Sequence, residues 1–293
     1  MKQLRILIVI IFIAIATAFV VYTERDRRTS DFTAPVIQAD SDTIEASVNV
    51  TDEELLKGMT ATDNLDGDVT ASLVVGSRSK FIRKGTVRVS YAAFDKNNNV
   101  GSYVRDLTYT DYVPPRFAIH APLAYIRSDT RDVQQVLKSI TAHDCIDGDI
   151  TPQIILTQGE TRVVNSDVTA QTVNLQVSNR SGDTSTLELE VLFEDYNVFN
   201  QQRPHLSDYL IYVKVGEHPD FRSISDGIGY GNNFTSFADS NYDRNRDVAI
   251  DTSEVDTDTP GTYHVTYTLT REVGEGGRRE DLGSAVLTIV VEE

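Results

Sequence analysis

Apolar and polar residues alternate along most of this chain, and the alternation predicts β-strands. Residues 86–94 place an apolar side chain at almost every second position, which is the period of a half-buried strand. Four further segments follow the same rule, at residues 173–177, 187–193, 263–269 and 285–291. Clusters of Gly, Asn, Asp and Pro separate the strands at intervals of roughly ten residues. This spacing is typical of an all-β sandwich.

Helix signals after the N-terminal region are few. Thr51 is followed three residues later by Glu54, and this pair predicts a capping box that opens a short helix at residues 51–57. Residues 132–137 occupy the matching place further along the chain. We therefore expect one short helix between early strands in each of the first two repeats.

One phrase of the sequence occurs twice. Residues 56–70 return as residues 137–151, and both copies contain Thr-Ala, Asp-Gly-Asp and a final Thr. An offset of 81 residues is the size of one small β-sandwich, so the repeat predicts an array of such modules. A second repeat relates residues 85–91 to residues 261–267. Pro-containing segments near residues 114–115 and 201–204 predict the module boundaries.

The predicted organisation is a membrane helix, a short stalk and three modules, of which the third is divergent in sequence. The expected bounds, in that order, are residues 1–23, 24–33, 34–114, 115–200 and 201–293.

The N-terminal region carries a membrane signal. An apolar run at residues 6–22, interrupted only by Thr17, lies between basic residues and a charged segment at residues 24–28. This run is long enough to cross a bilayer as one helix. A signal peptide cleaved after Ala18 is the alternative, but apolar residues continue beyond that point and favour an uncleaved signal anchor. We expect a single-pass protein of the cell membrane with extracellular domains.

The net charge limits the partners. The chain has 44 acidic and 27 basic residues, a formal net charge of −17, which excludes a nucleic-acid partner that needs clustered Lys and Arg. The single cysteine, Cys145, cannot form an internal disulfide and is interpreted as a structural thiol. The five histidines lack paired metal spacing, and no nucleophile or phosphate-binding motif is present in the sequence. We therefore predict that the protein is not an enzyme.

The two Asp-Gly-Asp phrases are the best candidate sites. Their carboxylates could bind calcium, which takes six to eight oxygen ligands, so further donors would have to come from neighbouring segments. The alternative is turn chemistry, in which Asp side chains accept hydrogen bonds from backbone N–H groups and glycine supplies a left-handed conformation. The turn is the preferred interpretation, and calcium is the one candidate cofactor. The candidate ligands are Asp63, Asp66, Asp68, Asp144, Asp147 and Asp149.

Aromatic residues gather in a Gly- and Asn-rich stretch at residues 217–247. They predict either a recognition surface or the core of the divergent module. They are Phe221, Tyr230, Phe234, Phe237 and Tyr242.

These repeated phrases resemble the bacterial immunoglobulin-like repeat first noted in pesticidal crystal proteins and common in exported proteins of Gram-positive bacteria. Residues 60–70 and 141–151 match its first part, and residues 255–267 match its second. The third module departs from the pattern, with Asn245-Arg246-Asp247 where Asp-Gly-Asp is expected. The resemblance implies an immunoglobulin-like sandwich at the cell surface and no common catalytic residues.

The sequence therefore predicts a non-catalytic, membrane-anchored repeat protein that acts as a surface spacer or adhesion module toward a cell-surface protein or glycan. Two alternatives stay open. One is a calcium-stabilised rod, and the other is a subunit of a larger surface assembly joined through strand edges.

Overall fold

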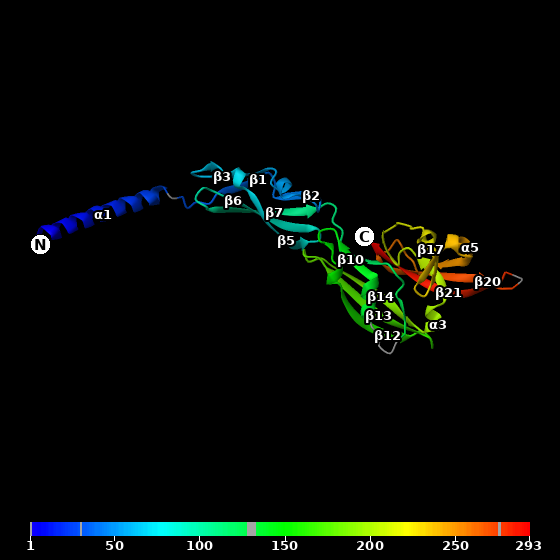
Figure 1. The fold of residues 1–293 in the computed structure, drawn as a ribbon. Coiled ribbons are helices and arrows are strands. Elements are labelled where there is room, and N and C mark those ends of the chain that lie inside the picture. The colour runs from blue at the N-terminus through cyan, green and yellow to red at the C-terminus, as the bar shows by residue number, and fades with distance from the viewer. Residues whose placement is uncertain (1, 30, 128–132, 275–276) are drawn as a thin grey trace. The chain divides into compact units, whose positions relative to one another are not determined.

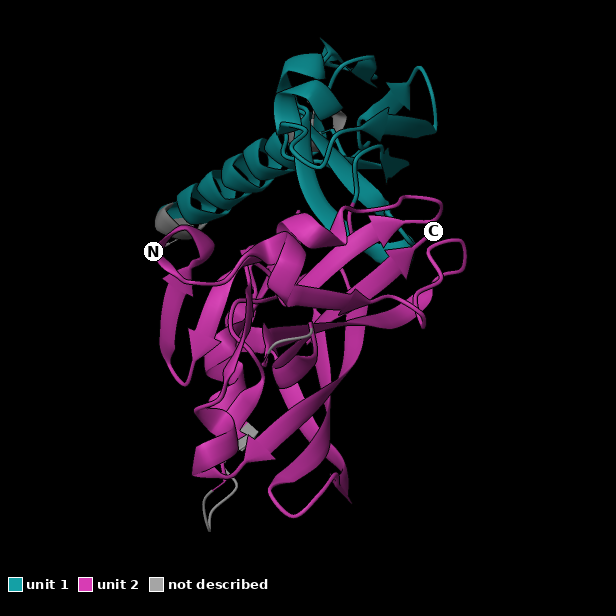
Figure 2. Ribbon diagram, turned by 90° about the vertical axis from the view of Figure 1, so that its right-hand side faces the viewer, with its two compact units in different colours: residues 1–112 teal, residues 113–293 magenta. Residues whose placement is uncertain are grey.

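The chain is mostly β-structure, with three pairs of sheets after an N-terminal helix (Figure 1). The computed structural model describes residues 2–29, 31–127, 133–274 and 277–293. The described chain divides into two compact units, residues 1–112 and 113–293, shown in separate colours in Figure 2. Unit 1 holds the helix and one sheet pair, and unit 2 holds the other two pairs.

Helix α1 spans Lys2–Thr29. Within the span Ile6–Arg25, an 18-residue window has a mean hydropathy of 2.9 and is not buried. Among the described residues, α1 is the one helix that is long and apolar enough to cross a membrane. The expected N-terminal apolar helix is therefore present.

Unit 1 contains one sandwich. Its three-stranded sheet has the order β1 (Val36–Ala39), β3 (Met59–Asp63), β4 (Gly67–Asp68). Its four-stranded sheet has the order β2 (Thr43–Ala46), β7 (Val100–Tyr109), β6 (Thr86–Phe94), β5 (Val74–Arg83). The short helix α2 (Asp52–Leu55) lies between β2 and β3, and a 3₁₀ turn follows β4 at Thr70–Ser72.

Unit 2 begins with a second sandwich of the same plan. Its three-stranded sheet is β11 (Gly148–Asp149), β10 (Ile140–Asp144), β8 (Arg116–Ile119). Its four-stranded sheet is β12 (Ile155–Val163), β13 (Val168–Ser178), β14 (Thr184–Glu194), β9 (Ala124–Ile126). Two 3₁₀ helices accompany them, at Val133–Ser139 and Thr151–Gln153.

The third sandwich completes unit 2. Its sheets are β15 (Gln202–Leu206), β17 (Ser225–Tyr230), β18 (Asn233–Ser236), and β16 (Leu210–Lys214), β21 (Arg279–Glu292), β20 (Gly261–Glu272), β19 (Val248–Asp251). Four short helices connect the strands: α3 (Tyr196–Phe199), α4 (Phe221–Ile224), a 3₁₀ turn at Phe237–Asp239, and α5 (Arg244–Asp247).

The three sandwiches share a split first strand. In unit 1, β1 pairs antiparallel with β3 in one sheet, and β2 then pairs parallel with β7 in the other. The parallel pair recurs as β9 with β14 and as β16 with β21. The divergent third module therefore has the topology of the first, and the predicted tandem β-sandwich fold is confirmed.

The predicted strands and helices are largely found where the patterns placed them. Strand β6 covers the predicted segment, and Thr51 and Glu54 form the capping box at α2. The second predicted helix is a 3₁₀ helix at Val133–Ser139, and Asp132 lies outside the described residues. The predicted module boundaries stay predictions; the sheet pairs themselves span residues 36–109, 116–194 and 202–292.

The two sandwiches of unit 2 share one continuous core. Phe117 and Ile140 of the second sandwich belong to the same buried cluster as Leu206 and Val265 of the third. The backbone joins them as well, because the N–H of Tyr209 donates to the carbonyl of Ile119 at 3.1 Å. The second and third sandwiches therefore form one packed body.

Replacing Leu287 by Ala tests the strand register of this body. Leu287 is fully buried on β21, whereas its neighbour Val286 is 45% exposed. We expect Leu287→Ala to lower the free energy of unfolding by about 2–5 kcal/mol, because it leaves a core cavity. Val286→Ala, the matched control, should stay within about 0.5 kcal/mol. Urea unfolding followed by circular dichroism measures both, and equal effects would contradict the register.

Candidate functional site

The first Asp-Gly-Asp phrase forms a hydrogen-bonded turn at the end of β3. Asp63 Oδ1 accepts hydrogen bonds from the N–H groups of Leu65 and Asp66 at 2.9 and 2.8 Å. Asp68 Oδ1 accepts one from the N–H of Thr70 at 2.9 Å. Gly67 has a φ of +73°, the left-handed region that favours glycine. These are the bonds and the backbone conformation that the turn interpretation predicts.

The second phrase repeats this turn at the end of β10. Asp144 Oδ1 accepts hydrogen bonds from the N–H groups of Ile146 and Asp147, both at 2.9 Å. Asp149 Oδ1 accepts one from Thr151 N–H at 2.9 Å. The same sequence therefore produces the same local structure in both units.

The middle carboxylate of each phrase has a basic partner. Asp66 accepts hydrogen bonds from the backbone N–H of Lys96 at 2.8 Å and from its Nζ at 2.9 Å. Asp147 likewise accepts from the backbone N–H of Arg180 at 2.6 Å, and Arg180 Nε lies 2.8 Å from its Oδ1. These two carboxylates tie the turn to the loop that follows the long strand β6 or β13.

The structure gathers a different set of carboxylates from the one that the sequence suggested. Among the described residues, Asp31, Asp63 and Asp95 each offer one oxygen, and these oxygens all lie within 4.8 Å of one another. We call these three residues the acidic cluster. Neither Asp-Gly-Asp phrase brings its own three carboxylates together in this way within the described chain. Of the predicted ligands, only Asp63 belongs to the cluster, and whether the other five bind metal stays a prediction.

Three separate segments position the acidic cluster. Asp31 precedes β1, Asp63 ends β3, and Asp95 follows β6; their exposed fractions are 7%, 8% and 6%. The side-chain amide of Asn99 donates to the carbonyl of Asp31 at 3.0 Å and to Asp95 Oδ2 at 2.6 Å. The backbone N–H groups of Asp66 and Leu65 hold the pKa of Asp63 below its usual value, against the opposing effect of burial.

A carboxylate that sequence reasoning missed lies in the third sandwich. Asp247 is 4% exposed and pairs with the guanidinium groups of Arg246, at 2.7 Å, and of Arg279. The N–H of Asp243 also donates to it at 2.8 Å. Arg246 contributes most to holding the pKa of Asp247 well below its usual range. The negative charge of Asp247 is therefore balanced by the two arginine side chains of the same sandwich.

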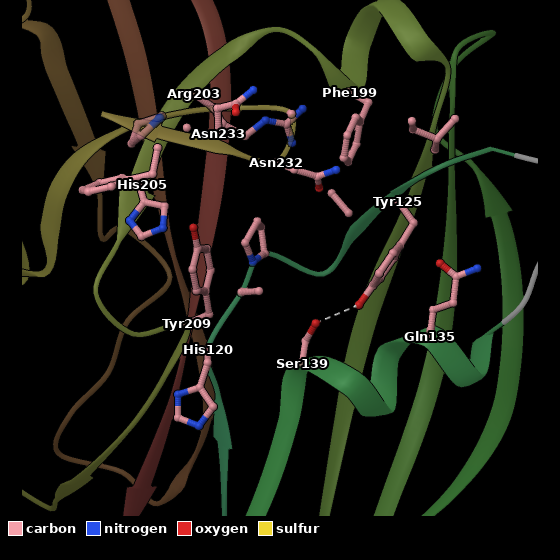
Figure 3. Close-up of a pocket in the computed structure, with 18 residues that line it drawn as sticks. His120, Tyr125, Gln135, Ser139, Phe199, Arg203, His205, Tyr209, Asn232 and Asn233 are labelled. Atoms are coloured by element: carbon pink, nitrogen blue, oxygen red, sulfur yellow. Dashed lines mark hydrogen bonds between the residues drawn. The ribbon is translucent and has the colours of Figure 1, made fainter. Parts of the chain in front are cut away.

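A cavity of about 500 Å³ opens in unit 2 (Figure 3). The second sandwich contributes Tyr125, whose hydroxyl lies 3.3 Å from the hydroxyl of Ser139. Figure 3 labels Phe199 of α3 at the cavity as well, and the third sandwich contributes residues of β15, β17 and β18. The volume is within the range of small-molecule sites. Amide, imidazole and guanidinium groups complete the lining: His120, Gln135, Arg203, His205, Asn232 and Asn233.

Several lining groups are held in place by neighbours. Arg203 forms two hydrogen bonds with Glu194, at 3.1 and 2.7 Å. His205 Nδ1 lies 2.7 Å from a carboxylate oxygen of Asp226, and its ring centroid is 4.4 Å from that of Phe234. The described residues that line the cavity include neither a carboxylate nor a cysteine. Aromatic faces beside amide, imidazole and hydroxyl groups suit a hydroxyl-rich ligand, and the guanidinium of Arg203 is already paired with Glu194.

The aromatic residues at 217–247 divide between the two predicted roles. Phe221, Phe237 and Tyr242 pack against the core of unit 2. Tyr230 and Phe234 are each 49% exposed, and Phe234 lines the cavity. One predicted recognition residue is therefore at a cavity wall, and three others stabilise the fold.

Comparisons with known proteins show distant similarity. No family model matches the chain. It is 27% identical, over 246 residues, to an uncharacterized 81.3 kDa protein of Acholeplasma phage L2. The match covers 82% of this chain and 30% of the phage protein. The chain thus spans less than a third of that protein's length.

Two solved structures of repeated domains are also similar. One contains the CBM51-2 and INT domains of ZmpB from Clostridium perfringens, with 16% identity, a TM-score of 0.21, and coverage of 55% of this chain and 44% of that one. The other is mouse cadherin-23 EC22-24, with 11% identity, a TM-score of 0.20, and coverage of 88% and 99%. These scores are low, so the fold assignment depends on the sheet topology, and the resemblance to the bacterial immunoglobulin-like repeat stays a prediction.

The ion pair at Asp247 should make unit 2 sensitive to acid. Because the folded-state pKa lies below the unfolded value of about 3.9, its stabilising contribution is present above that pH and is lost as the pH falls toward the folded pKa. Asp247→Asn should destabilise the protein at neutral pH and flatten the acid branch of the stability curve. Asp258→Asn, an exposed carboxylate of the same region, is the control. Unchanged acid unfolding of the Asp247 variant would contradict this assignment.

Proposed function

We propose that this chain is a non-catalytic spacer, anchored in the cell membrane by α1, that presents an interaction site on β-sandwiches outside the cytoplasm. The proposal rests mainly on the combination of one exposed apolar helix with three sheet pairs of repeated topology. Repetition of one fold lengthens the array without assembling a new chemical site in each copy.

The surface of α1 supports the anchor. Its apolar side chains remain exposed, for example Phe12 at 71% and Val21 at 66%, and such a surface needs a hydrocarbon environment. The hydroxyl of Thr17 donates to the carbonyl of Ile13 at 2.8 Å, so this polar group is satisfied inside the helix. A cleaved leader is the alternative, and it would release the same sandwiches as a secreted protein.

The cavity of unit 2 supports an interaction role. It is built where two sandwiches pack into one body, so its walls are held by a shared core. Aromatic faces and hydrogen-bonding side chains like those of its lining suit hydroxyl-rich molecules, through stacking and hydrogen bonding. We propose a surface saccharide as the ligand.

The sheet edges favour a spacer over assembly through strand pairing. Strand β5 carries Arg78, Lys80 and Arg83, and its register shifts repeatedly along β6. Strand β12 also contains a register shift, between Gln158 and Thr161. Bulges and charged side chains disfavour pairing of an exposed edge with another chain.

Protease accessibility in intact cells tests the location. We expect the untreated full-length chain to be recovered with the membrane fraction. We expect a protease added to intact cells to digest its sandwiches. Ile13→Arg should impair membrane retention, because a charge at the centre of the span costs roughly 2.5–3.5 kcal/mol. Thr29→Arg, at the end of α1, is the control. If the sandwiches were protected from protease until the cells were lysed, the proposed location would be overturned. If the mass of the mature protein matched a chain that begins at Phe19, the proposed anchor would be overturned.

Saccharide binding tests the interaction site. The full-length chain in nanodiscs should bind at least one member of an array of cell-surface and cell-wall saccharides. Phe234→Ala should weaken that binding by roughly tenfold or more, since stacking on the ring is lost. Tyr230→Ala is a closely matched control, because Tyr230 has the same exposure, lies in the same hairpin and is not among the residues lining the cavity. Equal loss in both variants, or no binding across the array, would refute the cavity assignment.

A further inference from the structure

The acidic cluster gathers three buried carboxylates that accept hydrogen bonds from backbone and amide groups but form no ion pair among the described residues. Among the described residues, no Lys or Arg lies within ion-pair distance of Asp31, Asp63 or Asp95. The nearby ammonium of Lys96 is engaged by Asp66 instead. Asp31 Oδ2 and Asp63 Oδ2 are inaccessible to solvent and have no hydrogen-bond partner among the residues that the structure describes. A buried carboxylate oxygen in this state is costly unless a cation or donor meets it.

The second sandwich shows how the same position is balanced by protein groups. Asp144 is the counterpart of Asp63, and Asn179 is the counterpart of Asp95 at the start of the corresponding loop. Here the side-chain amide of Asn179 donates to Asp144 Oδ2 at 3.0 Å. Asp144 Oδ2 therefore has the hydrogen-bond donor that Asp63 Oδ2 lacks, because the second sandwich has the amide of Asn179 where the first has the carboxylate of Asp95.

The third sandwich uses a second solution. Its buried Asp247 is neutralised by Arg246 and Arg279. Two buried aspartates of unit 2 thus have protein partners of their own, whereas the acidic cluster of unit 1 requires a positive group from outside the described chain.

We propose that Asp31, Asp63 and Asp95 together bind one calcium ion. All three donors are carboxylate oxygens, and neither His nor Cys joins them, which suits a hard cation and disfavours zinc or copper. Calcium–oxygen distances are about 2.4 Å, so two ligands on opposite sides of the ion lie about 4.8 Å apart. The three oxygens of the cluster lie within that separation of one another. Carboxylates can bind in monodentate or bidentate mode, and water or backbone carbonyls complete the six to eight ligands.

The ion fastens the segment that leaves α1 to the first sandwich. Asp31 belongs to this segment, whereas Asp63 and Asp95 belong to two strand ends of the sandwich. The segment already approaches β7 closely, because a Cβ built on Gly101 would lie 2.0 Å from the carbonyl oxygen of Pro35. Calcium therefore orders residues 31–35 and stiffens the junction between the membrane helix and the first β-strand.

Calcium titration of the full-length chain in detergent micelles tests the site. After treatment with a chelator, we expect isothermal titration to show one calcium ion bound per chain through this cluster, and calcium to raise the melting temperature of unit 1. Hydrogen exchange of the backbone at residues 31–35 should slow when calcium is added. An equal response to magnesium would overturn the assignment to calcium.

The decisive variant is Asp95→Asn, which copies the residue found in the second sandwich. It should weaken calcium binding at least tenfold and, in the metal-free protein, raise the melting temperature, because an amide can then donate to Asp63 as Asn179 does to Asp144. Asp68→Asn, in the same turn but outside the cluster, should change neither quantity.

Three results would overturn the site. The first is no calcium uptake at millimolar metal. The second is uptake that survives Asp95→Asn and is lost in Asp66→Asn or Asp147→Asn. The third is a metal-free Asp95→Asn protein that is less stable than the original. Saccharide binding by unit 2 does not enter any of these measurements, so the two proposals fail separately.

Discussion

Burial of inward-facing side chains between two separate sheets is the interaction on which each sandwich depends. The chain has one cysteine, so no internal disulfide joins the sheets. Fully buried residues such as Val89 and Leu107 of unit 1, or Leu175 and Leu287 of unit 2, hold them together instead. Each contributes roughly 1.5–3 kcal/mol relative to exposure. The split first strand adds a covalent crossing, because β1 belongs to one sheet and β2 to the other.

Much of this architecture could be predicted from the sequence, because the long strands show their period directly. Residues 86–94 alternate, and they form β6 without a change of bounds. The parallel pairing of β2 with β7 could not be predicted in the same way, since β2 has only 4 residues and its alternation is too short to read. Pro204, in the segment that predicts the second module boundary, lies on β15 at the edge of its sheet, where proline is tolerated.

The acidic cluster was only partly predictable. The repeated phrase marks Asp63, whereas Asp31 lies in the predicted stalk and no sequence pattern singles out Asp95, and only the fold brings the three together. One signal was available. Asp31 and Asp111 each stand four residues before a proline that leads into the first strand of a sandwich. Asp111 accepts hydrogen bonds from Ser47 and Val48, so the shared spacing serves different contacts at the two places.

The parallel pairing of first and last strands has a mechanical consequence. In each sandwich, the strand near the entry of the chain lies parallel to the strand near its exit, as β2 does with β7 and β16 with β21. Tension applied to the two ends of such a sandwich slides these strands past each other along their length. Every hydrogen bond of the ladder then carries load at once, whereas an antiparallel hairpin pulled at its open end would peel apart bond by bond. This strand arrangement therefore suits each sandwich to bear stretching force along the chain.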